Sequence, residues 1–321
     1  MIFQYIFLLL VALVTLVKAS DIFVDAASSL ATRLRVPKMI IALTVAAFGT
    51  CAPELAISFK SMATSNYDMT LANIIGSCVV NILLVVGIAS IVAPIKVKEQ
   101  TVKKELPLLA VVTGAFFIAL NDTLFGRPAN GLSYYDAIIF IILFVVFLAY
   151  LFVTVHFDKN QKYRNSRRLH SKYTLSRSIL YIIITLILIA LASDLAVDNA
   201  VALAQELHIS QKVIAMTIVV IGTSLPELVM TVSASRKGEH DLAIGNIIGT
   251  NIFNICIVLG LPTLVFGGFT SNAFNIVDGF VVLAAAVLYY LCGRSDKKLT
   301  RIEGIIMVMI FAAYYTYVLT N

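Results

Sequence analysis

Charged residues are scarce in this sequence. Asp, Glu, Lys and Arg together form 13% of its 321 residues, while 60% of the residues are hydrophobic. A soluble domain typically contains about 25% charged residues, so this composition indicates a protein embedded in a lipid bilayer. The chain also offers no stretch for a large soluble domain, and it contains no nucleotide-binding motif.

Cysteine and histidine are also few. The four cysteines lie inside apolar segments or at their ends, so they predict no disulfide framework. The four histidines are scattered over loops and segment ends, which argues against a nucleophile–base pair or a histidine metal centre. We therefore predict a protein that is not an enzyme and has no cofactor. Its net charge of +6 is confined to short loops, so we expect no nucleic-acid partner and no obligate protein partner.

Long apolar runs dominate the chain. A membrane-crossing helix needs about 20 apolar residues, and ten runs qualify as candidates. They cover residues 2–30, 39–60, 70–93, 106–121, 134–156, 175–203, 211–235, 241–266, 275–292 and 302–319. The first run could be a signal peptide, but it lacks a basic start and its continuation is repeated from residue 192 onward. We interpret it as the first helix of an all-α integral membrane protein with ten transmembrane helices.

The chain repeats itself with an offset of 173 residues. The stretch ASDIFVDAASSLA from Ala19 aligns with ASDLAVDNAVALA from Ala192, and LANIIGSCVVNILLVVG from Leu71 aligns with IGNIIGTNIFNICIVLG from Ile244. Shared apolar composition cannot explain matched Asp, Asn, Pro and Glu residues. Each copy contains five segments, and an odd number makes the second copy enter the membrane from the opposite side. We predict two inverted five-helix repeats, 1–156 and 175–321, with a binding site between them near mid-membrane.

The basic residues predict the orientation. Most of the 24 Lys and Arg residues fall after segments 1, 3, 7 and 9 and in the central loop, 157–174. By the positive-inside rule these loops are cytoplasmic, so both termini should be extracellular, in what we expect to be the plasma membrane. The basic central loop most simply fixes orientation, and a contact with phospholipid headgroups is the alternative.

Two glutamates lie in the middle of apolar runs, in matching contexts. Glu54 ends the stretch FGTCAPE and Glu227 ends IGTSLPE. A carboxylate at bilayer depth costs roughly 2.5–3.5 kcal/mol on insertion scales, so it is rarely present without a function. Pro53 and Pro226 each lack an N–H group and therefore free a backbone carbonyl one turn earlier. Such carbonyls are tolerated in the membrane where they line a cavity, and a hard cation is a natural partner for them.

Further residues with side-chain oxygens recur at regular spacing near these glutamates and in the next apolar run. Thr50 and Thr223 each lie four residues before a glutamate, on the same helical face. A second polar stripe repeats every four residues and comprises Asn73, Ser77, Asn81, Asn246, Thr250 and Asn254. We expect Asn73 and Asn246 to bond neighbouring helices, and Asn81 and Asn254 to line the centre. Gly76 and Gly249 beside the stripe should permit close helix approach. This donor set is almost entirely oxygen and suits Ca²⁺ or Na⁺.

The motifs GTCAPEL and GTSLPEL, followed by NIIGSCVVN and GNIIGTNIFN, resemble the two α-repeats of the sodium/calcium exchangers in the calcium:cation antiporter superfamily. The resemblance covers both halves and implies antiport of Ca²⁺ against Na⁺. It also implies a central calcium site at Glu54, Glu227, Thr50 and Thr223. The implied flanking sodium sites use Ser224, Ser77, Thr250 and the backbone of Ala47 and Val220, with Asn81 and Asn254 lining the centre.

Two positions depart from the family pattern. Cys51 stands where the second repeat has Ser224, and a thiol is a poor sodium ligand. Asn254 stands where some relatives carry an acid. With only two carboxylates, the resemblance implies calcium binding more firmly than a three-sodium stoichiometry. A proton-coupled calcium antiporter is the nearest alternative function, and a channel is an alternative of a different class.

Overall fold

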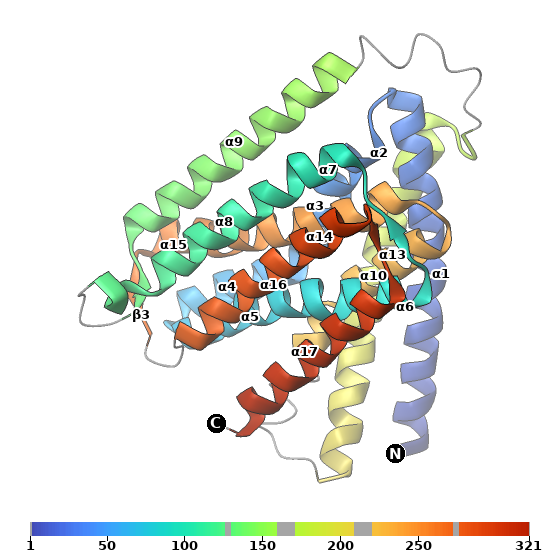
Figure 1. Cartoon of the computed structure of the whole chain (residues 1–321). Helices are drawn as coiled ribbons and strands as arrows, with labels where there is room; N and C mark the ends of the chain where they lie inside the picture. The colour runs from blue at the N-terminus through green and yellow to red at the C-terminus, as the bar shows by residue number, and fades with distance from the viewer. Residues whose placement is uncertain (1, 126–129, 159–170, 209–219, 272–275, 321) are drawn as a thin grey trace.

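A computed structural model of the chain describes residues 2–125, 130–158, 171–208, 220–271 and 276–320. The described residues are predominantly helical, with four strands of only two residues each (Figure 1). A helix occupies the described part of every predicted apolar run. The prediction of a helical membrane protein is confirmed at this level.

The N-terminal half contains three long helices and several broken ones. Its helical elements are α1 (Ile2–Leu34), α2 (Lys38–Ile41), η1 (Ala42–Ala46), α3 (Ala47–Thr50), α4 (Ala52–Ala63), α5 (Tyr67–Val79), η2 (Val80–Val85), α6 (Val86–Val92), α7 (Glu99–Lys103), α8 (Glu105–Leu120), η3 (Asp122–Phe125) and α9 (Tyr134–Asp158). Strands β1 (Ile95–Lys96) and β2 (Gly131–Leu132) lie in its loops.

The C-terminal half follows the same order. Its helical elements are α10 (Leu175–Glu206), α12 (Val220–Thr223), α13 (Leu225–Arg236), α14 (His240–Phe253), η5 (Asn254–Leu259), α15 (Gly260–Phe266), α16 (Ile276–Ser295) and α17 (Arg301–Thr320). Its strands are β3 (Phe269–Thr270) and β4 (Lys298–Leu299). Elements η1, η2 and η5 are π-helical turns, which are rare and often occur at functional sites.

Seven helices of the described chain are long and apolar enough to cross a membrane, or eight if the bent pair 38–50 and 52–63 counts as one span. Two of the ten predicted spans are not among them. Helix α8 has only 16 residues, and the predicted span 211–235 lies partly outside the described residues. The count of ten therefore stays a prediction.

The most buried spans form the centre of the molecule. Residues 67–92 and 240–266 are enclosed by other helices, whereas α1, α9 and α17 expose many apolar side chains on the outside. The long helices α1 and α10 pack against each other along one side (Figure 1). Exposed apolar side chains of this kind match a lipid environment, because lipid tails are as apolar as leucine.

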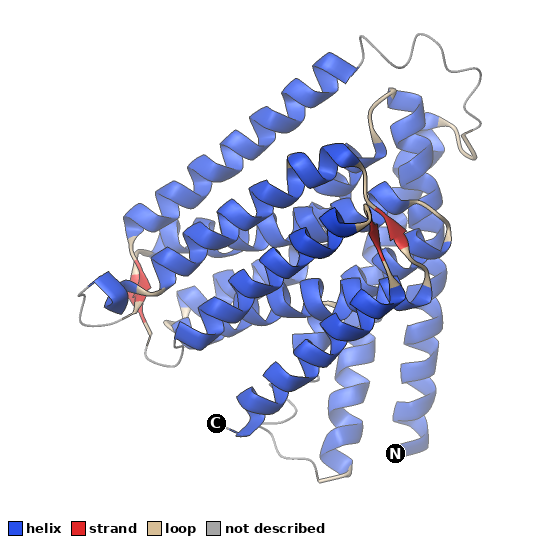
Figure 2. Cartoon of the chain, in the orientation of Figure 1, coloured by secondary structure: helices blue, strands red, loops and turns tan. Residues whose placement is uncertain are grey.

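Equivalent elements of the two halves make equivalent contacts across the molecule. Helix α3 packs against α14, and its counterpart α12 packs against α5. In the same way, α4 contacts η5 and α13 contacts η2. Strand β1 pairs with β4 and β2 pairs with β3, both antiparallel, and the two pairs lie at opposite ends of the molecule (Figure 2). Each half thus contributes its broken helix to the packing of the other half.

Candidate cation-binding site

Two broken helices carry the predicted glutamates. The first breaks at Cys51, where the bent pair turns by 47°. Cys51 has φ −79° and ψ 1°, and Ser224, at the equivalent break, has φ −90° and ψ 8°. The break falls there because Pro53 and Pro226 cannot donate the helical hydrogen bond to the carbonyl one turn back. Glu54 and Glu227 therefore lie in the first turn of a new helix.

Both glutamates are fully buried, each with 0% of its surface exposed. They lie near enough for their charges to interact, although they come from different halves of the chain. Within the described residues, none of their four carboxylate oxygens has a hydrogen-bond partner. A buried carboxylate that lacks a partner is costly, so this arrangement calls for a positive charge between the two groups.

Many of the buried polar atoms without a hydrogen bond belong to the predicted site residues. Across the described chain, six of the predicted site residues account for ten of the 20 buried side-chain nitrogen and oxygen atoms without a hydrogen bond. They are Glu54, Ser77, Asn81, Ser224, Glu227 and Asn254. Buried polar groups are normally paired, so the unpaired atoms of these six residues make them candidates to contact a ligand. The described residues contain no cluster of three or more His, Cys, Asp or Glu that could hold a metal.

The threonines link the two halves beside the glutamates. The hydroxyl oxygens of Thr50 and Thr250 lie 3.5 Å apart, and both side chains are buried. The thiol of Cys51 contacts the carbonyl oxygen of Thr250 at 3.8 Å. The predicted site residues Thr50 and Thr250 are thus brought together by the packing of α3 against α14.

The predicted backbone ligands already accept protein hydrogen bonds. The carbonyl of Ala47 accepts from the Thr50 hydroxyl at 3.3 Å and from the Cys51 N–H at 3.1 Å. The carbonyl of Val220 accepts from the Thr223 hydroxyl at 3.0 Å. Each carbonyl oxygen carries two lone pairs, so a hydrogen bond from the threonine hydroxyl does not prevent it from contacting a cation as well.

The prediction for the outer asparagines is confirmed. Asn73 on α5 donates to the Glu54 carbonyl at 3.2 Å and to the Ser58 hydroxyl at 3.4 Å. Its counterpart Asn246 on α14 donates to the hydroxyl of Thr231 on α13 at 3.2 Å. These asparagines tie each broken helix to the helix that follows it, and they hold the glutamate turns in place.

One residue of this arrangement escaped the sequence analysis. The hydroxyl of Ser193 on α10 donates to the carbonyl of Gly222 at 3.0 Å. This is the carbonyl that Pro226 deprives of its helical partner. The signal was present in the sequence, because Ser193 aligns with Ser20 inside the repeated ASD motif. The Gly222 carbonyl, predicted to be free for a cation, therefore has a serine partner.

Comparison with known proteins identifies the family. The family model described as sodium/calcium exchanger protein matches residues 4–153 and 177–320. The chain belongs to the sodium/calcium exchanger family. It is 30% identical to the sodium/calcium exchanger MaX1 of Methanosarcina acetivorans, over 96% of each chain. It is also 34% identical to the inner membrane protein YrbG of Escherichia coli, over 94% of this chain and 92% of that one.

A solved structure of the sodium–calcium exchanger NCX_Mj superposes on this chain with a TM-score of 0.82 at 29% identity, covering 98% of this chain and 99% of that one. The protein is thus a multi-pass integral membrane protein and a transporter rather than an enzyme. Together these likenesses support a cation/calcium antiporter.

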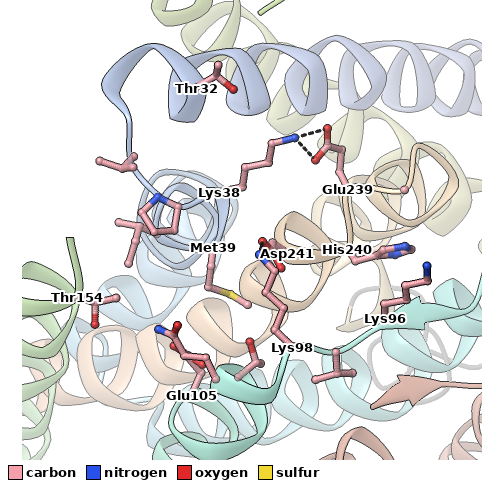
Figure 3. Close-up of a pocket in the computed structure, with 17 residues that line it drawn as sticks. Thr32, Lys38, Met39, Lys96, Lys98, Glu105, Thr154, Glu239, His240 and Asp241 are labelled. Carbon is pink, nitrogen blue, oxygen red and sulfur yellow. Dashed lines mark hydrogen bonds and ion pairs between the residues drawn. The ribbon is translucent and has the colours of Figure 1, made fainter. Parts of the chain in front are cut away.

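One cavity in the described part of the chain lies away from the glutamates. It has a volume of about 720 Å³, and neither Glu54 nor Glu227 lines it. Figure 3 shows that it opens beside the loop before α14, where Lys38 forms an ion pair with Glu239. The cavity belongs to one end of the molecule, and the buried carboxylates require access by another route.

Proposed function

We propose that this protein is a secondary antiporter that exchanges Ca²⁺ for Na⁺ across the plasma membrane. Its substrate Ca²⁺ binds at mid-membrane between the two repeats, at Glu54 and Glu227. The observation that carries the proposal is the pair of fully buried carboxylates, one from each half, with no hydrogen-bond partner among the described residues. Two carboxylates balance the charge of one Ca²⁺, and carboxylate, hydroxyl and amide oxygens are its usual ligands.

Exchange follows from competition for the same oxygens. In this proposal Thr50 and Thr223 complete the calcium site, and Asn81 and Asn254 line it. Sodium binds beside it, at Ser77, Ser224 and Thr250 and at the carbonyls of Ala47 and Val220. Because an empty pair of buried carboxylates is unfavourable in a low-dielectric interior, the unloaded site should rarely change sides. Movement of one ion is thereby coupled to movement of the other.

The proposed architecture is ten transmembrane helices in two inverted repeats, residues 1–156 and 175–321, joined by the loop 157–174. Its support is the equivalence of contacts between the halves and the position of the two strand pairs at opposite ends of the molecule. An inverted repeat places the binding site at the interface of the halves, where each half can rock against the other.

The function is tested by calcium flux in vesicles containing the purified protein, with sodium, potassium and pH varied independently. Sodium on the opposite side should drive calcium movement, and the flux should saturate. Flux that depends on a proton gradient and ignores sodium would favour the proton-coupled alternative. Calcium flux that needs no counter-ion and does not saturate would contradict antiport and favour a channel.

The proposed orientation has its own test. Single cysteines at Asn130 and Asn165 should react with a membrane-impermeant thiol reagent from opposite sides, Asn130 from outside and Asn165 from the cytoplasm. Residue 165 lies outside the described residues, so this expectation rests on the distribution of basic residues alone. The four native cysteines are buried, so the chain without an introduced cysteine is the control. Labelling of both positions from the same side would overturn the inverted-repeat proposal.

A further inference from the structure

The two long helices, α1 and α10, make unequal contacts with the broken helices of the opposite repeat. Helix α1 packs along α13, the second half of the broken helix in the other repeat. The counterpart of this pair is α10 against α4, and within the described residues these two helices make at most marginal contact. The structure is therefore closed along α1 and α13 and not along α10 and α4.

Polar contacts hold the closed side. Asp21 on α1 accepts a hydrogen bond from Ser233 at 2.5 Å, and Asp25 forms an ion pair with Lys237 at 2.7 Å. Just beyond, Glu239 forms an ion pair with Lys38 at 2.6 Å (Figure 3). These contacts join α1 and the start of α2 to the end of α13 and the loop that follows it.

The counterparts of these residues are unpaired on the other side. By the 173-residue offset, Asp194 corresponds to Asp21, Asp198 to Asp25, and Lys60 on α4 to Ser233. Asp194, Asp198 and Lys60 are exposed, and none has an ion pair among the described residues. Lys60 and Asp194 carry opposite charges. They therefore occupy the positions equivalent to those of the hydrogen-bonded pair on the closed side.

The serines of the repeated ASD motif show the same asymmetry. Ser193 donates to the carbonyl of Gly222, as described above. Its counterpart Ser20 is fully buried, and among the described residues its hydroxyl has no partner. The carbonyl equivalent to that of Gly222 belongs to Gly49, which Pro53 deprives of its helical hydrogen bond. The two halves thus differ both in the polar contacts at the ends of these helices and in the serine contacts near each glutamate.

We propose that Lys60 and Asp194 form an ion pair that closes the opposite face of the molecule, the extracellular face in the orientation given above, when α10 packs against α4. The proposal rests on the proposed antiport function. In an inverted repeat the two halves exchange conformations during transport, so a contact made by one half predicts the equivalent contact in the other half. Ser20 would then bond the Gly49 carbonyl, while Ser193 would release that of Gly222.

The two closures differ in charge. Lys237 corresponds to Thr64, and Glu239 corresponds to Asn66, so the ion pairs of the closed side have no charged equivalents at these positions. Lys60 with Asp194 is the charged contact that the sequence offers in their place. Closure of this face should therefore depend more strongly on a single ion pair than closure of the other face.

Cross-linking tests the proposed contact directly. The variant Lys60→Cys/Asp194→Cys is placed in vesicles and treated with a short bifunctional thiol reagent during calcium exchange. We expect a cross-link that reduces calcium flux at least tenfold and that a reducing agent reverses. The variant Asp21→Cys/Ser233→Cys is the matched control, because these side chains are in contact in the structure.

Charge exchange supplies an independent test. Lys60→Asp and Asp194→Lys should each slow exchange about two- to fivefold, the range expected of a solvent-accessible ion pair. The double variant should recover most of the wild-type rate, and Asp198→Asn should have little effect.

The outcomes separate this proposal from the proposed function. If the vesicles transport calcium and the control pair cross-links while the pair at 60 and 194 does not, the contact is wrong. It is also wrong if the charge-exchanged double variant is slower than both single variants. Failure of the unmodified chain to exchange calcium would instead contradict the proposed function.

Discussion

Replacing Glu54 or Glu227 by Gln is expected to abolish calcium transport. Each substitution leaves a single negative charge facing a divalent cation in a buried, low-dielectric site. Removing one partner from a buried charge pair typically costs about 3–5 kcal/mol, so calcium affinity should fall at least about 100-fold. The measurement is sodium-driven calcium flux per amount of folded protein in vesicles.

The folded structure should survive these substitutions. Glutamine has nearly the same size and shape as glutamate, so either substitution should keep the packing around a side chain that is already fully buried. Asp198→Asn is the matched control, because it removes a carboxylate from an exposed position on α10. Size-exclusion profiles of both glutamine variants should resemble that of the wild type. Near-normal flux in either variant would contradict the proposed calcium site.

A methyl group at Gly249 is expected to disable the protein almost as severely. A Cβ atom there would lie 2.8 Å from the Cβ of Ala47 and 2.9 Å from the backbone Cα and carbonyl oxygen of Leu43. Backbone atoms cannot rotate away, so Gly249→Ala must push α14 from α3 and η1. Overpacking of this kind typically costs about 1–3 kcal/mol. It also separates Thr50 from Thr250, so transport should fall at least about tenfold.

Alanine variants of two other glycines serve as controls for Gly249→Ala. Gly114 has no atom within 4 Å of an added Cβ, so Gly114→Ala should leave folding and flux unchanged. Gly76 is the repeat counterpart of Gly249, but an added Cβ there meets the Val220 side chain, its nearest atom at 2.6 Å. Because a side chain can shift, Gly76→Ala should be milder. Flux per folded protein and thermal unfolding of the three variants are the readouts, and a neutral Gly249→Ala would show that α14 and α3 can separate without loss.

The sequence was informative where chemistry alone explains a residue. Glu54 and Glu227 are too costly in an apolar run to lack a function, and their repetition with Pro53 and Pro226 marked both helix breaks. The close approach expected at Gly76 and Gly249 is confirmed, because each meets the broken helix of the other half. The length of the apolar runs located the helices, since long apolar runs have few structural alternatives in a bilayer.

The sequence was uninformative where one group has a choice of partners. It predicted free carbonyls one turn before both prolines, but the Gly222 carbonyl has Ser193 as a partner while Ser20 has none among the described residues. Two acids also find partners far along the chain, since Asp68 accepts from the Ser271 hydroxyl and Asp241 pairs with Lys98. Hydrogen-bond partners more than 100 residues apart depend on how helices pack, which local patterns do not specify.

The sequence by itself determined that this is a membrane protein built from two related halves, each with a glutamate in a matching apolar context. Composition, hydrophobic run length and the 173-residue repeat are properties of the chain alone. Only the tertiary structure decided that the two carboxylates lie near enough for their charges to interact and that α1 packs along α13 while α10 does not pack along α4. The physical reason is that a repeat makes two arrangements of the halves nearly equal in energy, and the contacts between the halves select one of them.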